Sequence, residues 1–246
     1  MTIAAIWNDI AILAQPALYN IYFALIAIPL GFGLAVLIAL GKASRNRIVS
    51  SLCRIYIYFF RGSPFFIQLF AFYSLALSFN LTLWKPLGID GLILHPLFLG
   101  PLILALNTTA YTAEIFYGAL LAVPRGEIDA ARAFGMSRRQ RFGAVVWPHL
   151  IRIAWPAYTN EVVFLFQATA LIYFTLPVIG AQQDLMNKAG ELFERDYNIF
   201  LHFGVAALYF LAISLAIFYL FGLVYRRLMR HQPQAKMTFS FRRIVS

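Results

Sequence analysis

Charged residues are absent from five long stretches of the chain, and these stretches set its expected architecture. Each is at least 22 residues long; they span 10–41, 62–84, 91–113, 162–183 and 197–225. A helix needs about 20 apolar residues to cross the hydrocarbon core of a bilayer, whereas an apolar run of roughly 10–14 is typical of a buried helix in a soluble protein. None of the stretches alternates apolar and polar residues as the strands of a membrane barrel do. The pattern predicts an all-α integral membrane protein with five transmembrane helices.

Proline and glycine refine where these helices begin, end and break. Residues 3–14 are expected to form a short amphipathic lead-in at the membrane interface, and 42–54 a basic turn. The expected spans are about 18–40, 55–79, 97–121, 153–178 and 199–225. The second span should be interrupted around Gly62 and Pro64, and the fourth near Pro177, because proline cannot donate to the helical hydrogen-bond ladder. The expected domains are a single transmembrane domain over residues 1–230 and a basic tail over 231–246.

Lysine and arginine gather on one side of the predicted bundle. Of the 20 basic residues, 17 lie in the segments 42–61, 125–152 and 226–243. Cytoplasmic segments of membrane proteins carry such an excess of Lys and Arg, so these segments are expected inside the cell. The rule therefore places the N-terminus outside and the C-terminus in the cytoplasm, which agrees with an odd number of crossings.

Composition excludes several other classes of protein. Apolar residues make up 61% of the chain and charged residues only 12%, too few to cover a soluble core of this length. The net charge is +10, and the basic residues that produce it flank the predicted spans. Membrane orientation and anionic lipids therefore explain this charge better than binding to nucleic acid does. The lone Cys53 implies no disulfide framework. No basic segment precedes the first apolar run, so a cleaved signal peptide is not expected. No nucleophile, phosphate-loop or metal-binding motif is present, and no catalytic or metal site is expected in the sequence.

The longest polar segment on the cytoplasmic side, residues 124–152, is expected to be helical. Its Asp129-Ala130-Ala131 favours a short helix, and Gly135 is a plausible stop for it. A short rigid helix between two membrane helices is suited to docking against a soluble motor. On composition alone, an amphipathic surface helix without a partner is the favoured interpretation.

The spacing within this segment resembles a known signature. The segment is similar to the cytoplasmic loop of ATP-binding-cassette (ABC) importer permeases, which reads Glu-Ala-Ala, three residues, Gly, nine residues, Ile, one residue and Leu-Pro. This chain has Asp129-Ala130-Ala131, Gly135, Val145 and Trp147-Pro148 at the same spacing. Asp replaces Glu and Val replaces Ile with the chemistry kept, whereas Trp147 is bulkier than the Leu it replaces.

Three further segments resemble the permeases of the polar amino-acid family. These are residues 60–64 with 68–70 (FRGSP, QLF), residues 107–115 (NTTAYTAEI) and residues 156–161 (PAYTNE). Many members then carry Lys-Asp-Thr-Ser-Leu, whereas this chain has Gln-Ala-Thr-Ala-Leu at 167–171, which is more like the HisM-type subunits of cationic amino-acid importers. The resemblance covers about 17–230.

This resemblance implies a fold, a location and partners. It implies the ABC type I importer permease fold in a bacterial inner membrane, with a periplasmic N-terminus. It implies a second permease subunit, identical or different, two ATPase subunits that carry the ATP and Mg, and a periplasmic amino-acid-binding protein; no cofactor is expected in this chain. A coupling segment, 124–148, would dock on the ATPase through Glu127, Asp129, Ala130, Ala131, Phe134, Gly135, Met136 and Ser137. The implied cargo is a cationic amino acid (histidine, arginine, lysine or ornithine), with an opine as the alternative.

Polar residues inside the apolar spans are the candidates for the substrate pathway. Ionisable groups at membrane depth are costly and face a cavity or a partner. Two acids, Glu114 and Glu161, have no basic residue nearby in the sequence, which favours a positively charged cargo. The alternative is that both are paired within the bundle and that the neutral residues bond between helices. The full set is Glu114, Glu161, Asn160, Thr108, Tyr111, Thr112, Gln167 and Thr169.

Two other classes of function remain as alternatives. An intramembrane enzyme could use the two acids as an acid–base pair, but they lie on separate spans and no nucleophile accompanies them. A stand-alone channel or secondary carrier would not need the loop at 129–148. Dependence of uptake on ATP would distinguish a carrier from an ABC importer.

Overall fold

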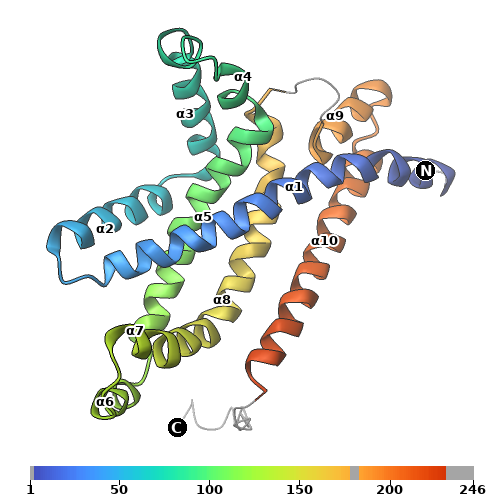
Figure 1. Cartoon of the computed structure of the whole chain (residues 1–246). Helices are drawn as coiled ribbons and strands as arrows, with labels where there is room; N and C mark the ends of the chain where they lie inside the picture. The colour runs from blue at the N-terminus through green and yellow to red at the C-terminus, as the bar shows by residue number, and fades with distance from the viewer. Residues whose placement is uncertain (1–2, 178–182, 231–246) are drawn as a thin grey trace, which may run out of the picture.

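The computed structural model describes residues 3–177 and 183–230, and in these residues all regular structure is helical (Figure 1). The long helices are α1 (Ile3–Lys42), α2 (Arg47–Gly62), α3 (Phe65–Ser78), α5 (Pro96–Leu121), α8 (Trp147–Ala168) and α10 (Ile199–Leu228). The all-α prediction therefore holds for the described residues. The tail at 231–246, the loop at 178–182 and residues 1–2 lie outside them.

Helix α1 is continuous from Ile3 to Lys42, so the prediction of a separate lead-in at 3–14 is wrong. Pro16 and Pro29 lie inside α1 without ending it. Such prolines are tolerated in membrane helices because neighbouring groups satisfy the freed carbonyls. One face of the early turns is buried: Asp9 and Leu13 are covered, and Leu13 packs with α9 and α10. These contacts extend α1 well beyond its apolar stretch.

The predicted break in the second span is confirmed. Helices α2 and α3 meet at an angle of 109°, with Ser63 and Pro64 in extended conformation between them. The Gln68 Nε2 amide donates to the Phe60 carbonyl (2.7 Å) and the Ser63 carbonyl (3.0 Å), which fixes the corner. Helix α2 begins at Arg47, eight residues before the predicted start, because Asn46 caps its first turn through bonds to Ile48 and Val49.

Helix α5 lies at the centre of the molecule, with α1 crossing it and α2, α3 and α8 around it (Figure 1). The α1–α5 crossing is close at Gly31, where a Cβ atom would lie 2.4 Å from the Thr108 Cγ2 atom and 3.3 Å from the Ala105 carbonyl oxygen. A glycine is therefore required at this crossing. The connection from α3 to α5 contains the short helices η1 (Asn80–Trp84) and α4 (Asp90–Ile93).

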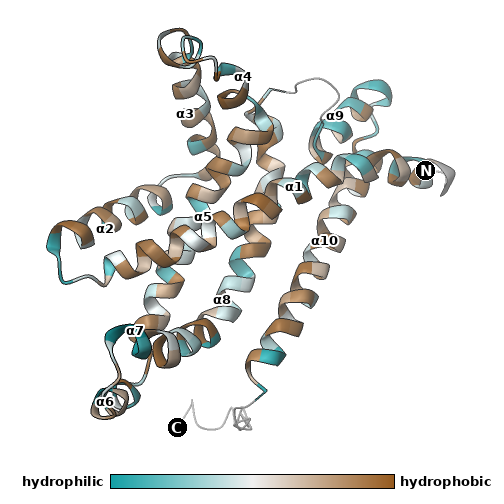
Figure 2. Ribbon diagram, viewed as in Figure 1, coloured by the Kyte–Doolittle hydropathy of each residue, from teal (hydrophilic) through white to brown (hydrophobic). Residues whose placement is uncertain are grey.

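Short helices occupy the two ends of the bundle. Helices α6 (Arg125–Ala133), α7 (Arg138–Arg141) and η2 (Phe142–Val146) connect α5 to α8. At the other end, η3 (Thr169–Phe174) follows α8, and α9 (Leu185–Asp196) precedes α10. Helical structure therefore ends before Pro177, where a break was predicted. In Figure 2, α7 and α9 are largely hydrophilic and α10 largely hydrophobic.

Length and apolarity single out two helices that could each cross a membrane, Ala5–Lys42 and Ile199–Leu228; the bent pair α2–α3 would be a third if it counts as one span.

Three apolar clusters hold the bundle together. One joins α1, α3, α5 and α8 around Phe166, a second joins α1, α5 and α8 around Phe116, and a third joins α1, α9 and α10 around Leu185.

Candidate functional site

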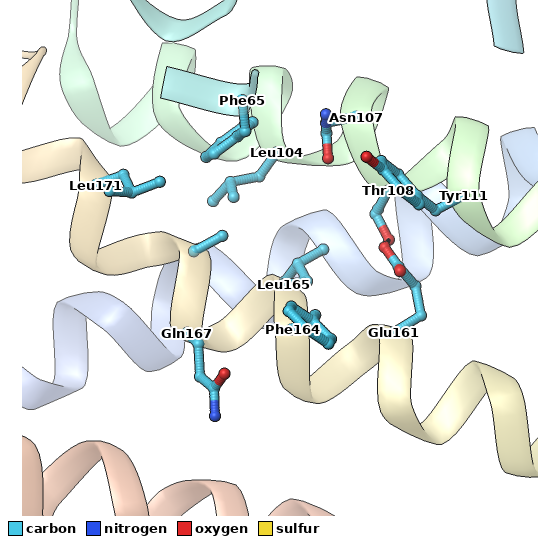
Figure 3. A pocket seen from close by; sticks show the side chains of 11 residues that line it. Phe65, Leu104, Asn107, Thr108, Tyr111, Glu161, Phe164, Leu165, Gln167 and Leu171 are labelled. Atoms are coloured by element: carbon cyan, nitrogen blue, oxygen red, sulfur yellow. Dashed lines mark hydrogen bonds between the residues drawn. The ribbon is translucent and has the colours of Figure 1, made fainter. Parts of the chain in front are cut away.

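A cavity of about 470 Å³ lies between α3, α5 and α8 (Figure 3). Its wall is mainly apolar and includes Phe65, Leu104 and Leu171. The polar groups in the wall are Asn107, Thr108, Tyr111, Glu161 and Gln167. A largely apolar pocket with a few convergent polar groups is the usual form of a small-molecule site.

One carboxylate faces this cavity. The Thr108 hydroxyl donates a hydrogen bond of 2.8 Å to Glu161 Oε1, which joins α5 to α8 (Figure 3). Among the described residues, Glu161 has no basic residue within ion-pair distance, whereas Glu114 has one. An acid held in a cavity without a cation supplies negative potential for a positively charged ligand.

The corner between α2 and α3 connects to the same cavity. The Asn107 amide donates a bond of 2.8 Å to Gln68 Oε1, while the Gln68 amide holds the corner. Gln68 was not predicted as a site residue. A glutamine within an apolar span, four residues after Pro64, is the signal in the sequence that would have indicated it.

Glu114 lies outside this cavity. Its Oε2 atom is 2.5 Å from Lys42 Nζ, and the same ammonium group lies 4.2 Å from the centre of the Tyr117 ring. The expectation that Glu114 has no cation nearby is therefore wrong, because its partner comes from the end of α1, 72 residues away in the sequence. This contact fits the alternative that Glu114 is paired within the bundle.

The other predicted pathway residues divide into two groups. Thr108, Tyr111 and Gln167 line the cavity with Glu161, although the Gln167 side chain points away from Phe65 and Asn107 (Figure 3). The rest lie outside it: Asn160 is exposed, and Thr112 and Thr169 are fully buried. Thr169 is occupied by bonds from the Asn20 amide (2.9 Å) and to the Phe166 carbonyl (2.6 Å).

The predicted docking helix is present as α6. Gly135 follows it with φ of +76°, a left-handed conformation that glycine adopts readily, so the predicted stop is confirmed. Phe134 is 85% exposed beside it, an unusual position for so large an apolar side chain. Ala131 instead is buried, and a contact of 3.2 Å between Glu127 and His149 ties α6 to α8.

The exposed face of α6 and the turn after it contain most of the predicted docking residues. Exposed side chains or backbone are found at Glu127, Asp129, Ala130, Phe134, Gly135, Met136 and Ser137. Ser137 also caps α7 by reciprocal bonds with Gln140. The segment is therefore a firmly anchored helix with an apolar tip.

A second ionic cluster at the opposite end of the bundle was not predicted. His202 of α10 is buried, with Nδ1 2.5 Å from Asp9 Oδ2 of α1 and Nε2 2.8 Å from Asp196 Oδ1 at the end of α9. Asp9 lies 193 residues from His202, so no local pattern indicates that contact, whereas Asp196 comes only six residues before His202. The cluster joins the first, the ninth and the last α-helix.

A helical membrane bundle with an internal cavity that contains a few polar groups, and with a short helix projecting from one end, is the form of a transport permease. Residues 16–232 match the family described as "Binding-protein-dependent transport system inner membrane component", and the chain belongs to this family. The family predicted from the motifs is thereby confirmed.

Known relatives share most of the chain. It is 37% identical to the histidine/lysine/arginine/ornithine transport system permease protein HisM of Salmonella typhimurium over 83% of this chain and 85% of the relative. The Escherichia coli HisM is 34% identical over 86% and 87% of the two chains. The nopaline transport system permease protein NocM of Agrobacterium fabrum is 43% identical over 60% of this chain and 61% of the relative. These relatives are permease proteins rather than enzymes.

The fold matches that of a solved transporter. The structure described as "Crystal structure of an amino acid ABC transporter with histidines" superposes with a TM-score of 0.74 at 24% identity, covering 92% of this chain and 99% of the other. An inward-facing MetNI methionine ABC transporter gives a TM-score of 0.63 at 18% identity. The fold is therefore that of an ABC importer permease.

Proposed function

We propose that the protein is the membrane-spanning permease subunit of an ABC importer for cationic amino acids. The observation that carries this proposal is the Glu161 carboxylate, which faces the cavity and has no basic residue within ion-pair distance among the described residues. The names of the relatives agree with it, since HisM is a histidine, lysine, arginine and ornithine permease and ArtM of Haemophilus influenzae is an arginine permease.

In this proposal the chain crosses the membrane five times, through α1, the bent pair α2–α3, α5, α8 and α10. The N-terminus lies in the periplasm and the C-terminus in the cytoplasm of a bacterium. The basic segments then flank the cytoplasmic ends of the helices, as the positive-inside rule requires. The α3–α5 connection and α9 lie outside, where a periplasmic binding protein would deliver the cargo.

Transport is driven from the cytoplasmic side in this proposal. Two ATPase subunits bind ATP and Mg, and their closure moves α6 of this chain and the equivalent helix of a second permease subunit. Because α6 is anchored to α8 through Glu127 and His149, its movement is passed to the helix that carries Glu161. Hydrolysis on the ATPase then returns the bundles to the inward-facing state.

An opine is the second candidate cargo. The sequence identity to the nopaline permease is higher than that to HisM, at 43%, but the match covers only 148 residues. A nopaline-type opine contains an arginine moiety, so the same acidic cavity would receive its guanidinium group. Binding measurements on the cognate periplasmic protein distinguish these cargoes.

The substrate class is tested by Glu161→Gln in the complete importer reconstituted in proteoliposomes. We expect uptake of arginine and lysine to fall about tenfold or more, because the variant loses a charge-assisted contact. Histidine is largely neutral at pH 8, so at that pH the variant should impair histidine uptake less than arginine uptake. Equal uptake of arginine and lysine by variant and wild type at pH 8 would contradict the proposal.

Docking is tested by cross-linking. A cysteine at Ala130 or Phe134 should form a cross-link to the ATPase subunit, whereas a cysteine at the exposed Thr82 of the outer connection should form none. Failure at every position from 127 to 138 would contradict the docking role of α6.

A further inference from the structure

A second pocket adjoins the cavity on the side of α2. It has a volume of about 710 Å³ and is lined by Lys42, Arg54, Ile57, Tyr58, Arg61, Gly62, Tyr111 and Glu114. Tyr111 also lines the cavity that contains Glu161, so one side chain forms part of both walls. The two pockets therefore meet at Tyr111.

The second pocket has an excess of positive charge. Lys42 is neutralised by Glu114 at 2.5 Å. Arg54 and Arg61 have no carboxylate side chain within ion-pair distance, and the described residues include all ten acidic residues of the chain. Neither guanidinium group forms an ion pair within the described residues, although Arg61 is near enough to Glu161 for a longer-range attraction, so both are accessible to an anion.

Arg61 is held at the junction of the two pockets. Its guanidinium carbon lies 5.3 Å from the centre of the Tyr111 ring, within the range of a cation–π contact. The residue belongs to the last turn of α2, directly before the corner that Gln68 fixes. Arg54 lies two turns earlier on the same helix and has no aromatic contact of this kind among the described residues.

The cavity around Glu161 is poor in groups that could bind an anion. No basic residue lines it. The Asn107 amide and the Thr108 hydroxyl already donate to Gln68 and Glu161, and the remaining side-chain donors in the wall, Tyr111 and Gln167, are neutral. An amino-acid substrate carries a carboxylate, which would be costly to bring into this apolar cavity without a partner.

We propose that Arg61 determines specificity by binding the α-carboxylate of the substrate while the cationic group of the substrate faces Glu161. The inference rests on the proposed function and adds the group that recognises the part common to all its cargoes. A guanidinium group binds a carboxylate through two parallel hydrogen bonds, which an ammonium group cannot reproduce. The stack on Tyr111 presents the fork of Arg61 where the two pockets meet.

The test uses the importer assembled from this chain and its partner subunits, in detergent and without the binding protein. Displacement of tritiated arginine is measured with arginine and with agmatine, which keeps the guanidinium group and lacks the carboxylate. Wild type should bind arginine about 10- to 100-fold more tightly than agmatine, as expected for one charge-assisted contact. Arg61→Gln should lose this preference by weakening arginine alone. Because only this chain is altered, differences among variants arise at its own site.

Arg54→Gln is the matched control, since it removes an equal charge from the same helix and pocket. It should keep the preference for arginine within about twofold. Arg61→Lys keeps the charge and loses the fork, so its preference should fall between those of wild type and Arg61→Gln; it also serves if the glutamine variant does not assemble.

The outcomes separate this inference from the proposed function. If wild type binds arginine but Arg61→Gln keeps the preference, or weakens arginine and agmatine equally, the carboxylate role is wrong and the cationic cargo stands. Equal loss of preference in Arg54→Gln would also contradict a specific role for Arg61. If wild type binds neither ligand, the proposed substrate class is itself wrong.

Discussion

Glu114 and Glu161 are both acids in the membrane helices, but their surroundings differ. Glu114 has an ion-pair partner in Lys42, whereas Glu161 has a hydroxyl partner in Thr108 and faces a cavity. A carboxylate that is neutralised by a lysine of the same chain adds little negative electrostatic potential to attract a cationic ligand. At the scale of single residues, this difference supports a structural role for Glu114 and, in the proposed function, a cargo role for Glu161.

The role of the Lys42–Glu114 pair can be measured directly. Glu114→Gln leaves the partly buried ammonium group of Lys42 unpaired, so we expect it to lower the free energy of unfolding by about 1–3 kcal/mol. The double variant Lys42→Met, Glu114→Gln should recover most of this loss because no unpaired charge remains. Thermal unfolding of the detergent-solubilised protein provides the comparison. Wild-type stability in Glu114→Gln, together with impaired uptake, would instead favour a contact with the cargo.

Asp184 should make stability depend on pH. It caps α9 by accepting from the Asn187 backbone at 2.8 Å, and burial raises its pKa from 3.8 to about 6. The folded state therefore holds the proton more tightly than the unfolded state does. The contribution of Asp184 to the free energy of unfolding is therefore largest below pH 3.8. It falls by roughly 2–3 kcal/mol as the pH rises from there to above about 6.

Replacement of this acid separates its charge from its capping role. Asp184→Asn keeps a good capping side chain without the charge, so the melting temperature should rise at pH 8 and match wild type near pH 4. Asp184→Ala loses the cap and should be less stable than Asp184→Asn at both pH values. If Asp184→Asn instead melts below wild type at pH 8, the charge is stabilising and the expected pH dependence is wrong.

At the scale of helices, the crossing of α1 and α5 depends on one missing side chain. Gly31→Ala would place a Cβ atom 2.4 Å from Thr108 Cγ2, in the middle of the bundle. Relief of this contact requires the helices to separate, at a cost of about 1–3 kcal/mol. Gly33→Ala is the control on the same helix, since nothing lies within 4 Å of its Cβ position. Similar melting temperatures for the two variants would contradict the tight crossing.

The same crossing also connects the packing of α1 to the site. Thr108 donates to Glu161, so displacement of Thr108 by a methyl group at position 31 moves the bond that orients the carboxylate. We therefore expect arginine uptake by Gly31→Ala to fall even at temperatures where the protein is fully folded, and uptake by Gly33→Ala to stay near wild type.

The helices that the sequence predicted well are those with local signals. Gly62 and Pro64 mark the α2–α3 corner. Gly135 ends the predicted docking segment because its positive φ is a conformation that glycine adopts readily. The continuity of α1 and the early start of α2 were missed because they depend on contacts of Leu13 and on the Asn46 cap rather than on hydropathy.

The candidate site was predictable only in part, for a related physical reason. A polar residue in an apolar span indicates that it faces something other than lipid, but not what it faces. Thr108 and Glu161 meet across two helices, while Thr169 meets Asn20 of α1 and is closed off from the cavity. Lys42 and Arg61 were counted only as flanking charges, since their contacts with Glu114 and Tyr111 come from tertiary structure.

At the scale of the whole molecule, the orientation in the membrane can be tested by labelling. The only cysteine, Cys53, is buried beside α1, where the Gly41 Cβ position would lie 2.5 Å from its sulfur atom, so its background reaction should be low. A membrane-impermeant maleimide should label Thr82→Cys in intact spheroplasts. Ser44→Cys and Ser137→Cys should react only after permeabilisation. Reaction of all three in intact cells would contradict the proposed topology.

The exposed surface of the isolated chain fits an assembled membrane complex. Large apolar side chains such as Tyr58, Phe59 and Ile67 are exposed on α2 and α3, and Leu211 and Leu215 on α10. Lipid and a second permease subunit would cover these faces. The apolar tip at Phe134 instead lies among charged residues of α6 and α7, where a soluble partner would cover it.

The contact between Asp9 and His202 has a consequence for how the protein is made. The two residues are 193 positions apart, so a ribosome adding 5–20 residues per second reaches His202 roughly 10–40 s after Asp9. Throughout that interval the carboxylate of Asp9 lacks its partner His202. The start of α1 can therefore complete its native contacts only after α10 has been made. A chain truncated before α10 would leave the Asp9 carboxylate without its partner, and we expect such a chain to be degraded.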